Sequence, residues 1–556
     1  MSGEGNRFRA AGYEQPKPLI VIDGKPAIEH VVSMFPGETR ITFICNREHL
    51  ESTNMRAVLT KIAPSAKIVQ VEPHKLGPVF AVAQCLDCIE DSEEVIVNYC
   101  DFFAYFNYDH FLREVRERKA AGCVLSYRGF HPHMLGTDHY AFIRDRDQYL
   151  LEIREKQPFT SDRMSEFAST GTYYFQKGDY VKRYFTRLIE RGIHTNGEYY
   201  VSMIYNLMVE DGLSVWIHEV QHMLQWGTPK DLEEYLNWSD YFRSCIDEAH
   251  RQPVGLLQNT VNLIPMAGHG LRFQHAAIKT PKPFILIAGK SMFLQASASL
   301  PPAERVIFVC LADQVERVRA EITACAPIYR DEVDVGVDVV SIQSPSRGQA
   351  ETCMIGIAGA DPPISDDDHL IIGACDNAML YDSSKFLKLI ETGVEAVAFT
   401  FRNHPSSNRN PQMYGWIATE YGTNRATGVS VKKAISADPR KDHAIVGAFY
   451  FRNVYLFRKA FEQMIKGDIR INDEYYVDSL FGILIENGHD CRVFEVDNYI
   501  CWGTPDDWKT FCYWQSFFHK CQWHPYSLEK DPTCHFGDKP LLSTIDASFS
   551  VRPLVS

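Results

Sequence analysis

The sequence predicts an α/β protein with two tandem Rossmann-like domains, each built on a mostly parallel mixed sheet flanked by helices. Three observations lead to this fold class. The chain has 556 residues, which is too many for a single hydrophobic core. Short β-rich segments alternate with helical segments, the pattern of a parallel-rich sheet. Long stretches of the first half also recur in the second half.

The repeat keeps a nearly constant spacing. A glycine-rich segment that begins at Gly3 returns at Gly268, 265 positions later. An apolar segment that ends at Asp101 returns with its end at Asp376, 275 positions later. The small drift indicates short loop insertions in the second copy. The predicted parts are domain 1 at 1–250, a join near 251–259, domain 2 at 259–530 and an irregular C-terminal tail at 531–556.

Strands and helices can be assigned in order along the first copy. The β-rich segments lie at 17–22, 41–46, 66–72, 93–101 and 123–129. Branched and aromatic residues, which favour strands, dominate them. Helical segments at 26–34 and 79–89 lie between them, and an aromatic stretch at 508–523 predicts a helix that packs on the second domain.

One strand of the repeat is missing from the first copy. The second copy has an apolar segment at 261–265 directly before Met266, and Met1 aligns with Met266. This first strand is central in a doubly wound sheet, so its loss would leave backbone groups of the neighbouring strands unpaired. We therefore expect native residues to precede Met1.

Composition narrows the function classes. A net charge of −14 argues against a sequence-independent nucleic-acid binder, which needs a broad basic surface. No apolar run approaches the roughly 20 residues of a membrane span. The 15 cysteines lack the doubled pair spacing of a zinc site and suit a reducing, cytoplasmic compartment.

The glycine-rich segment of each copy has the features of a phosphate-binding loop. Its two glycines allow backbone N–H groups to approach a polyphosphate closely. An arginine then offers a fork of donors, and ten residues later a lysine between two prolines adds a point charge. These residues are Gly3, Gly5, Arg7 and Lys17 in the first copy and Gly268, Gly270, Arg272 and Lys282 in the second.

Taken together, the motifs resemble the sugar-phosphate nucleotidylyltransferase family. The matching motifs are GxGxRF, PKP, an Asp at a strand end, an EK pair, NGEYY and WGTPxDL. The resemblance covers nearly all of both copies and is greatest to the branch that serves capsule and surface glycans. It implies a Mg²⁺-dependent, pyrophosphorylase-type reaction. A phosphate monoester attacks the α-phosphorus of a nucleoside triphosphate (NTP), and pyrophosphate leaves.

The resemblance also implies roles for single residues. The NTP phosphates would be held by Arg7, Lys17, Arg272 and Lys282, and Mg²⁺ by Asp101 and Asp376. The acceptor phosphate would bind Lys156 and Lys433, and Glu198 and Glu474 would contact the acceptor or the metal. The nucleotide would further contact Gly3, Gly5, Glu72 and Gly77 in the first copy and Gly268, Gly270, Gln343 and Gly348 in the second.

The base-reading loop of the first copy departs from the family pattern. Glu72 stands where the second copy has Gln343, and Pro78 removes one N–H donor directly after Gly77. The two copies therefore prefer different nucleotides, or the first copy is impaired. We expect the second copy to be the catalytically competent one.

The residues expected on the acceptor side of the site also depart from the family pattern. A second metal-binding Asp, usual in sugar 1-phosphate enzymes, is replaced by Gln225 and Cys501, neither of which is a good Mg²⁺ ligand. Two alternatives follow. Either the acceptor is a sugar phosphate and another ligand takes the place of the second Asp in the metal site, or the acceptor is a different phosphate or phosphonate, as in choline-phosphate-type relatives. Lys432, which aligns with Glu155, removes an acidic contact from the second copy.

Two other functions stay open. A GT-A glycosyltransferase shares the α/β architecture but typically carries Asp-x-Asp, which Asp101 and Asp376 do not form. Alternatively, one copy is a non-catalytic regulatory or scaffold domain, and its departures make the first copy the candidate.

Overall fold

The computed structural model describes the chain except Ser2, Glu4, Asp138, 248–255, 326–334, 538–539 and 551–556. The chain divides into two compact units. Unit 1 takes in Met1–Ser239, Cys521–His524 and the described residues from Ser543 on, and unit 2 takes in Asp240–Lys520 and Pro525–Leu542. The boundary after Ser239 falls within helix α9 (Pro229–Cys245), while part of the expected join at 251–259 lies outside the described residues.

Unit 2 is built on a nine-stranded mixed sheet. Its main path runs β17-β16-β13-β18-β23-β20-β24, and the hairpin β21-β22 pairs with β23. The first four strands are parallel, β23 is antiparallel to both neighbours, and β24 is parallel to β20. The strands are β13 (Leu257–Pro265), β16 (Ala303–Leu311), β17 (Gly336–Ile342), β18 (His369–Ile372), β20 (Ala396–Phe401), β21 (Gly415–Thr419), β22 (Ala426–Val431), β23 (His443–Phe451) and β24 (Cys491–Glu495).

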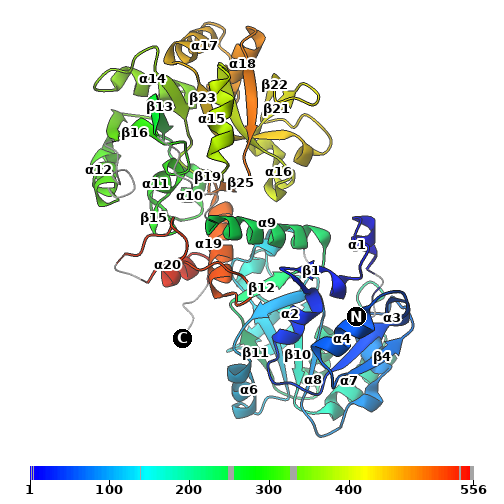
Figure 1. Cartoon of the computed structure of the whole chain (residues 1–556). Coiled ribbons are helices and arrows are strands. Elements are labelled where there is room, and N and C mark those ends of the chain that lie inside the picture. Colours follow the sequence, from blue (N-terminus) through cyan, green and yellow to red (C-terminus); the bar gives the residue numbers. More distant parts are fainter. Residues whose placement is uncertain are drawn as a thin grey trace. The chain divides into compact units, whose positions relative to one another are not determined.

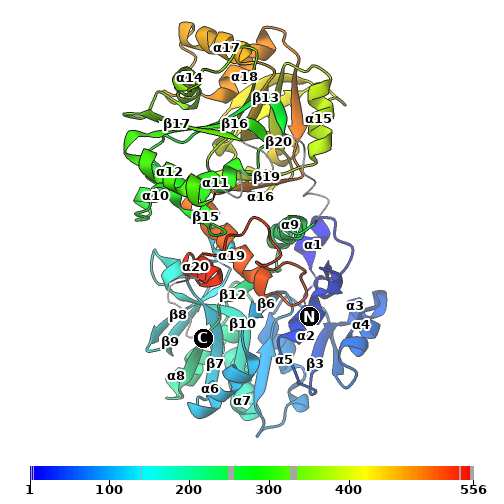
Figure 2. The same cartoon turned by 60° about the vertical axis from the view of Figure 1, so that its left-hand side comes forward.

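Helices cover both faces of this sheet, and Figure 2 shows α14 on one side of β16 and β17, with α11 and α12 on the other. Alternate residues of a strand face opposite sides. Leu263 accordingly packs in the core with α14, α17 and α18, while Ile264 packs in the core with α11, α12 and α15. The helices of unit 2 are α10 (Leu271–His275), α11 (Met292–Ser297), α12 (Val315–Ala324), α14 (Gln349–Gly359), α15 (Ser383–Glu391), α16 (Pro405–Arg409), α17 (Val454–Lys466), α18 (Val477–Glu486) and α19 (Pro505–Lys520).

Unit 1 has the corresponding strands, but they form two separate sheets. A six-stranded sheet runs β5-β10-β7-β11-β9-β8, and β3 pairs in parallel with β4 in a two-stranded sheet. These strands are β3 (Thr42–Asn46), β4 (Lys67–Val71), β5 (Val95–Asn98), β7 (Gly122–Tyr127), β8 (Ala141–Arg146), β9 (Tyr149–Glu155), β10 (Phe167–Phe175) and β11 (Val215–Glu219). Among the described residues, unit 1 has no counterpart of β13, which in unit 2 joins β16 to β18.

The helices of unit 1 flank these sheets (Figure 1). They are α1 (Asn6–Ala10), α2 (Ala27–Ser33), α3 (Arg47–Ser52), α4 (Met55–Ile62), α5 (Pro78–Ala83), α6 (Tyr108–Glu117), α7 (Gly178–Glu190) and α8 (Ile204–Glu210). Small antiparallel ladders complete both units: β1 (Val21–Ile22) with β2 (Lys25–Pro26), β6 (Phe102–Tyr105) with β12 (His222–Gln225), β14 (Leu286–Ile287) with β15 (Lys290–Ser291), and β19 (Asn377–Leu380) with β25 (Asn498–Cys501).

The α/β fold class is confirmed, and two element predictions are corrected. The segment at 17–22 forms a 3₁₀ turn at Lys17–Leu19 and only two strand residues, because Pro16 and Pro18 lack the N–H groups of a longer ladder. The tail at 531–556 is not wholly irregular, since Leu541–Ala547 forms helix α20. In the described ranges, no helix combines the length and apolar character needed to cross a bilayer.

Candidate functional site

A lysine and an aspartate meet beside the glycine loop of unit 2. Gly270 adopts a φ of 62°, and a Cβ atom there would lie 3.0 Å from the Cβ of Lys282, so glycine lets the loop lie against this lysine. The Lys282 ammonium forms an ion pair with the Asp376 carboxylate. Burial alone would lower the pKa of Lys282, but the adjacent carboxylate outweighs it and raises that pKa above its ordinary value.

Unit 1 repeats the Lys–Asp pair, whereas a Cβ on Gly5 would meet nothing within 4 Å. Lys17 Nζ lies 3.2 Å from Asp101 Oδ2 and donates to the carbonyl of Gly227 at 2.9 Å. Both side chains of the pair are partly exposed, Lys17 at 24% and Asp101 at 30%. The pair therefore lies at the surface, where a ligand can reach both charges.

Short ladders fix the two aspartates at the carboxyl ends of β5 and β18. The backbone N–H of Trp226 donates to the Asp101 carbonyl at 2.9 Å, and that of Trp502 donates to the Asp376 carbonyl at 2.8 Å. A Cβ on Gly503 would lie 3.1 Å from the Asp376 carboxylate and 3.3 Å from Cys501 Sγ. The glycine of WGTP thus allows the chain to pass close to the carboxylate.

Asp101 and Asp376 each offer a carboxylate to a divalent cation. Gln225 and Cys501 lie beside Asp101 and Asp376, at the positions where sequence analysis expected a second metal ligand. Neither replaces a carboxylate. Mg²⁺ commonly binds one or two carboxylates, several waters and substrate phosphates, so a single aspartate still fits this ion.

A second cluster in unit 1 joins two residues assigned to the acceptor. Lys156 Nζ donates to the Tyr200 hydroxyl at 2.6 Å, and that hydroxyl donates to the Glu198 carboxylate. Sequence analysis missed Tyr200, although it repeats as Tyr476 in the matched NGEYY and NDEYY segments. The cluster combines one positive charge with a carboxylate, as a phosphorylated polyol acceptor would require.

A buried carboxylate lies behind this lysine. Ser202 Oγ donates to Glu155 Oε2 at 2.7 Å. Burial raises the pKa of Glu155 to about 7, although the Ser202 hydrogen bond and the charge of Lys156 both act to lower it. Glu155 is therefore partly protonated near neutral pH.

We predict a pH-dependent stability difference between the parent protein and Glu155→Gln. The pKa of Glu155 is higher in the folded state than in the unfolded state, so its stabilising contribution is complete below about pH 4.5 and is lost as the pH rises through about 7. Glutamine does not titrate. The melting temperature of the variant relative to the parent should therefore rise between pH 5 and pH 8; a constant difference across this range would contradict the prediction.

In unit 2 the structure corrects one alignment by a residue. Lys432, with a φ of 61°, matches Lys156, with a φ of 59°, and both backbone N–H groups bond to a tyrosine carbonyl. Lys432 Nζ lies 5.4 Å from the centre of the Tyr476 ring, as Lys156 Nζ lies 4.6 Å from that of Tyr200. The assigned residue, Lys433, is exposed and follows this position.

The shifted register also changes which residue of unit 2 matches Glu155. Val431, and not Lys432, aligns with Glu155 once the register is shifted. Burial lowers the pKa of Lys432, and the Asp478 carboxylate is the strongest charge that opposes this effect. Burial likewise raises the pKa of Asp478 to about 6. Both units thus place a carboxylate of raised pKa near the lysine, from different elements.

The two arginines of the loops lie near Tyr200 and Tyr476. Arg7 and Arg272 lie exposed on the short helices α1 and α10. Burial raises the pKa of Tyr200, and the charge of Arg7 is among the smaller effects that lower it. Arg272 acts in the same way on Tyr476. Each arginine therefore lies near the matching acceptor tyrosine.

Gly77 and Gly348, which were predicted to contact the nucleotide, lie against the turns that carry Glu198 and Glu474. A Cβ on Gly77 would lie 2.7 Å from the backbone N and O of Tyr199, and one on Gly348 would lie 2.5 Å from the backbone N of Tyr475. These tyrosines follow Glu198 and Glu474 directly. Only glycine allows so close an approach, so the two loops hold each other in place.

The remaining predicted residues lie at the surface around the site. Gly3 and Gly268 have open space around their Cα atoms, and Gln343 is exposed after β17. Glu72 is exposed after β4 and forms an ion pair with Arg47, with 2.9 Å between Oε1 and Nη1. The carboxylate of Glu72 is thus engaged by a neighbouring side chain.

A separate group in unit 1 also has ligands that could hold a metal ion. It consists of His110 and Glu114 on α6 and His218 on β11, and sequence analysis did not identify it. His218 Nδ1 and Glu114 Oε2 already form a hydrogen-bonded pair at 2.6 Å. This pair connects α6 to the sheet and contains none of the predicted site residues.

Comparisons with known proteins show what parts of the chain are similar to. Two curated relatives are the bifunctional protein GlmU of Desulfitobacterium hafniense strain Y51 and that of strain DSM 10664 / DCB-2. Each is 22% identical over 217 residues, which make up 38% of this chain and 44% of the relative. The chain therefore spans less than half the length of these relatives.

Two solved structures align with lower identity. The nucleoside-diphosphate-sugar pyrophosphorylase from Vibrio cholerae RC9 is 18% identical with a TM-score of 0.36, and the match covers 45% of this chain and 98% of that one. The inositol-1-phosphate CTP transferase from T. maritima is 13% identical with a TM-score of 0.36, over 46% of this chain and 94% of that one. Residues 1–196 match the model of the nucleotidyl transferase family.

Proposed function

We propose that the protein transfers a nucleoside monophosphate from an NTP to a phosphorylated small-molecule acceptor and releases pyrophosphate. The observation that carries this proposal is the grouping of charges in each unit. A Lys–Asp pair beside a glycine loop, suited to a nucleotide polyphosphate, lies near a second lysine suited to an acceptor phosphate. In unit 2 these lysines are Lys282 and Lys432, and both are affected by the charge of Asp376.

The reaction is an in-line displacement in which the site's main tasks are to position the substrates and neutralise charge. An oxygen of the acceptor phosphate forms a bond to the α-phosphorus, and the bond from that phosphorus to the pyrophosphate oxygen breaks. Lys282 and Arg272 would hold the phosphates that become pyrophosphate. Lys432 would hold the acceptor phosphate, and Glu474, which accepts a hydrogen bond from Tyr476, would contact its polyol.

Asp101 and Asp376 would hold Mg²⁺ together with phosphate oxygens. When bound, the ion supplies positive charge where negative charge develops on the phosphates. In the structure, the Asp101 carboxylate forms an ion pair with Lys17, and the Asp376 carboxylate forms one with Lys282. We propose that the lysine turns towards the phosphates when the substrate and the ion bind.

The finer proposal is a tandem enzyme that makes an activated glycan precursor. To test it, the protein is mixed with Mg²⁺, each NTP in turn and a panel of sugar phosphates, polyol phosphates and phosphonates, and pyrophosphate is measured. Release that requires both substrates and Mg²⁺ is expected. The absence of release with every pair would overturn the proposal, and transfer of a sugar from a nucleotide sugar would favour the glycosyltransferase alternative.

A regulatory role for unit 1 is a second candidate. Glu72 pairs with Arg47, and Pro78 occupies the first position of α5, where unit 2 has Gln349 and its free N–H. Both differences weaken nucleotide contacts in unit 1. If unit 1 is regulatory, Asp101→Asn should leave pyrophosphate release unchanged while Asp376→Asn abolishes it; if both units are active, each variant should retain part of the activity.

A further inference from the structure

Helix α6 carries two potential metal ligands on the side that meets β11 (Figure 1). His110 and Glu114 are four residues apart, and residues at that spacing lie on one face of a helix. His218 on β11 completes the group, and the ligand atoms of the three side chains lie within 4.8 Å of one another. Within the part of the chain that the structure describes, this is the one group of three such side chains that could hold a metal ion.

Packed secondary structure holds these three side chains in place. β11 pairs with β7 on one edge and with β9 on the other, so His218 lies on an inner strand of the sheet. Helix α6 begins with a cap, because the backbone N–H of His110 donates to Asn107 Oδ1 at 2.9 Å. Phe111 and Val115 of the same helix are buried. The positions of the ligands therefore depend on a helix and a strand, which hold a site more precisely than a loop does.

The distances in the group are close to those of a metal site. His218 Nδ1 lies 2.6 Å from Glu114 Oε2, and the ring centres of His110 and His218 are 6.0 Å apart. Ligands of tetrahedral Zn²⁺ lie about 2.0–2.2 Å from the ion, which places them roughly 3.4 Å from one another. A small opening of the hydrogen-bonded pair and a rotation of the exposed His110 side chain would reach that spacing. The backbone of neither element has to move.

The group is apolar on one side and open on the other. The ring of His218 packs against those of Phe106 and Phe111, with centres 6.2 Å and 5.2 Å apart. The side chain of His218 is 9% exposed and that of Glu114 is 22% exposed, whereas His110 is exposed. Apolar surroundings strengthen the attraction between a cation and its ligands. The exposed side beside His110 gives an ion a path from solvent.

We propose that His110, Glu114 and His218 bind one Zn²⁺ ion, with water as the fourth ligand. Two imidazoles and a carboxylate form a ligand set that proteins use for zinc. The nitrogen donors disfavour Mg²⁺ and Ca²⁺, which prefer oxygen ligands. The ion takes the place of the proton between His218 Nδ1 and Glu114 Oε2 and links α6 to β11.

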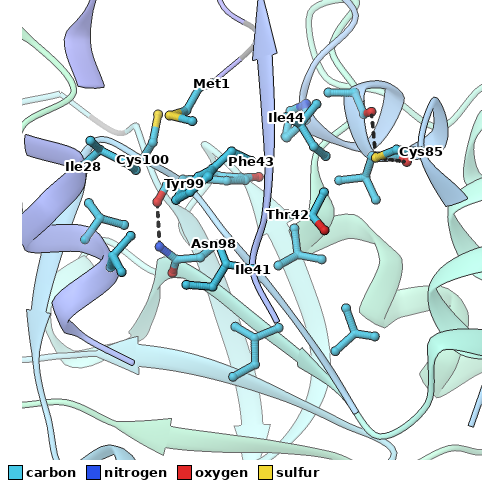
Figure 3. Close-up of a pocket in the computed structure, with 18 of the residues that line it drawn as sticks. Met1, Ile28, Ile41, Thr42, Phe43, Ile44, Cys85, Asn98, Tyr99 and Cys100 are labelled. Carbon is cyan, nitrogen blue, oxygen red and sulfur yellow. Dashed lines mark hydrogen bonds between the residues drawn. The ribbon is translucent and has the colours of Figure 1, made fainter. Parts of the chain in front are cut away.

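The opposite face of α6 has a different environment. Leu112 and Arg116 line a cavity of about 1440 Å³ in unit 1, which also reaches Asp101. Figure 3 shows Thr42 and Phe43 in its wall. None of the three zinc ligands lines this cavity. The zinc site is therefore separate from the cavity and from the carboxylate proposed to hold Mg²⁺.

The test titrates Zn²⁺ into the untagged full chain by calorimetry, in the presence of a phosphine reductant and excess Mg²⁺. The Mg²⁺ competes for sites made of oxygen ligands, such as those at Asp101 and Asp376. We expect one Zn²⁺ per chain in the parent. Binding to His110→Ala should be at least about 100-fold weaker, since loss of a group behind a ligand already costs about 10–100-fold. Alanine is a good helix former, so this exposed substitution should leave α6 folded.

His489→Ala is the matched control. His489 Nδ1 forms the same kind of pair with Glu395 Oε1, at 2.9 Å. In the described ranges, however, this pair is not part of a group of three potential ligands. The variant should therefore bind Zn²⁺ as the parent does. Co²⁺ is titrated in parallel, because thiolate ligands give it an intense near-ultraviolet band that imidazole and carboxylate ligands do not.

Four results would overturn the zinc site. They are absence of binding by the parent, equal affinity of the parent and His110→Ala, equal losses in His110→Ala and His489→Ala, and a thiolate band from Co²⁺ in the parent. The last two would assign the ion to exposed histidines in general or to cysteines. Pyrophosphate release enters none of these measurements, so failure of the proposed function would not affect the result.

Discussion

Asp376→Asn is expected to lower pyrophosphate release by unit 2 on the order of 10²–10³-fold, the usual cost of removing one group that stabilises transition-state charge. The amide keeps the shape of the side chain but removes the negative charge that pairs with Lys282 and that the proposed Mg²⁺ site would use. The measurement is made in an Asp101→Asn background, so that unit 1 does not contribute. The reciprocal pair of variants reports on unit 1.

A matched control separates this effect from a general loss of folding. Asp382 caps α15 by accepting from the N–H groups of Ser384 and Lys385, and asparagine caps equally well. Asp382→Asn should therefore retain full activity. Asp376→Asn also leaves Lys282 without its carboxylate, which should lower the free energy of unfolding by about 1–3 kcal/mol, so both variants are assayed well below their melting temperatures. Unchanged release by Asp376→Asn would contradict the assigned role.

The part of the site that could be predicted from the sequence depends on motifs within short segments of the chain. The GxGxRF and PKP motifs lie within short segments, and the structure brings Lys17 to Asp101 and Lys282 to Asp376 as ion pairs. The alternation of strand and helix likewise predicted the α/β class. In both cases the chain's local chemistry fixes the outcome.

Other features of the site depend on the exact alignment of the two copies and on contacts between distant residues, which sequence motifs do not reveal. Lys432 and Lys433 are adjacent and identical in type, so the sequence does not tell them apart. The equivalent residue is identified by the positive φ, the backbone bond to a tyrosine carbonyl and the contact with a tyrosine ring that Lys432 shares with Lys156. Asp478 was missed because its aligned residue in unit 1 is Ser202. The carboxylate near the lysine comes from helix α18 in unit 2 and from Glu155 on strand β9 in unit 1. The repeat did not predict that β3 and β4 would form a sheet apart from the six-stranded sheet of unit 1.

Gly348→Ala should lower the free energy of unfolding of unit 2 by about 2–4 kcal/mol, the range expected from a strained backbone combined with a steric clash. Gly348 has a φ of 133°, and an added Cβ would lie 2.5 Å from the backbone N and 2.6 Å from the backbone O of Tyr475. The main chain has to move, and with it the turn that carries Glu474. Activity of unit 2 should therefore fall together with stability.

Gly482→Ala is the matched control for this prediction. Gly482 lies inside α18, and an added Cβ would meet Val429 at an ordinary 3.6 Å. Alanine there should leave stability unchanged or raise it by about 0.5–1 kcal/mol, because glycine weakens a helix interior. Chemical unfolding of both variants, followed by fluorescence, measures the difference. Equal stability of the two would mean that the contact between Gly348 and Tyr475 does not hold the nucleotide loop against the acceptor turn.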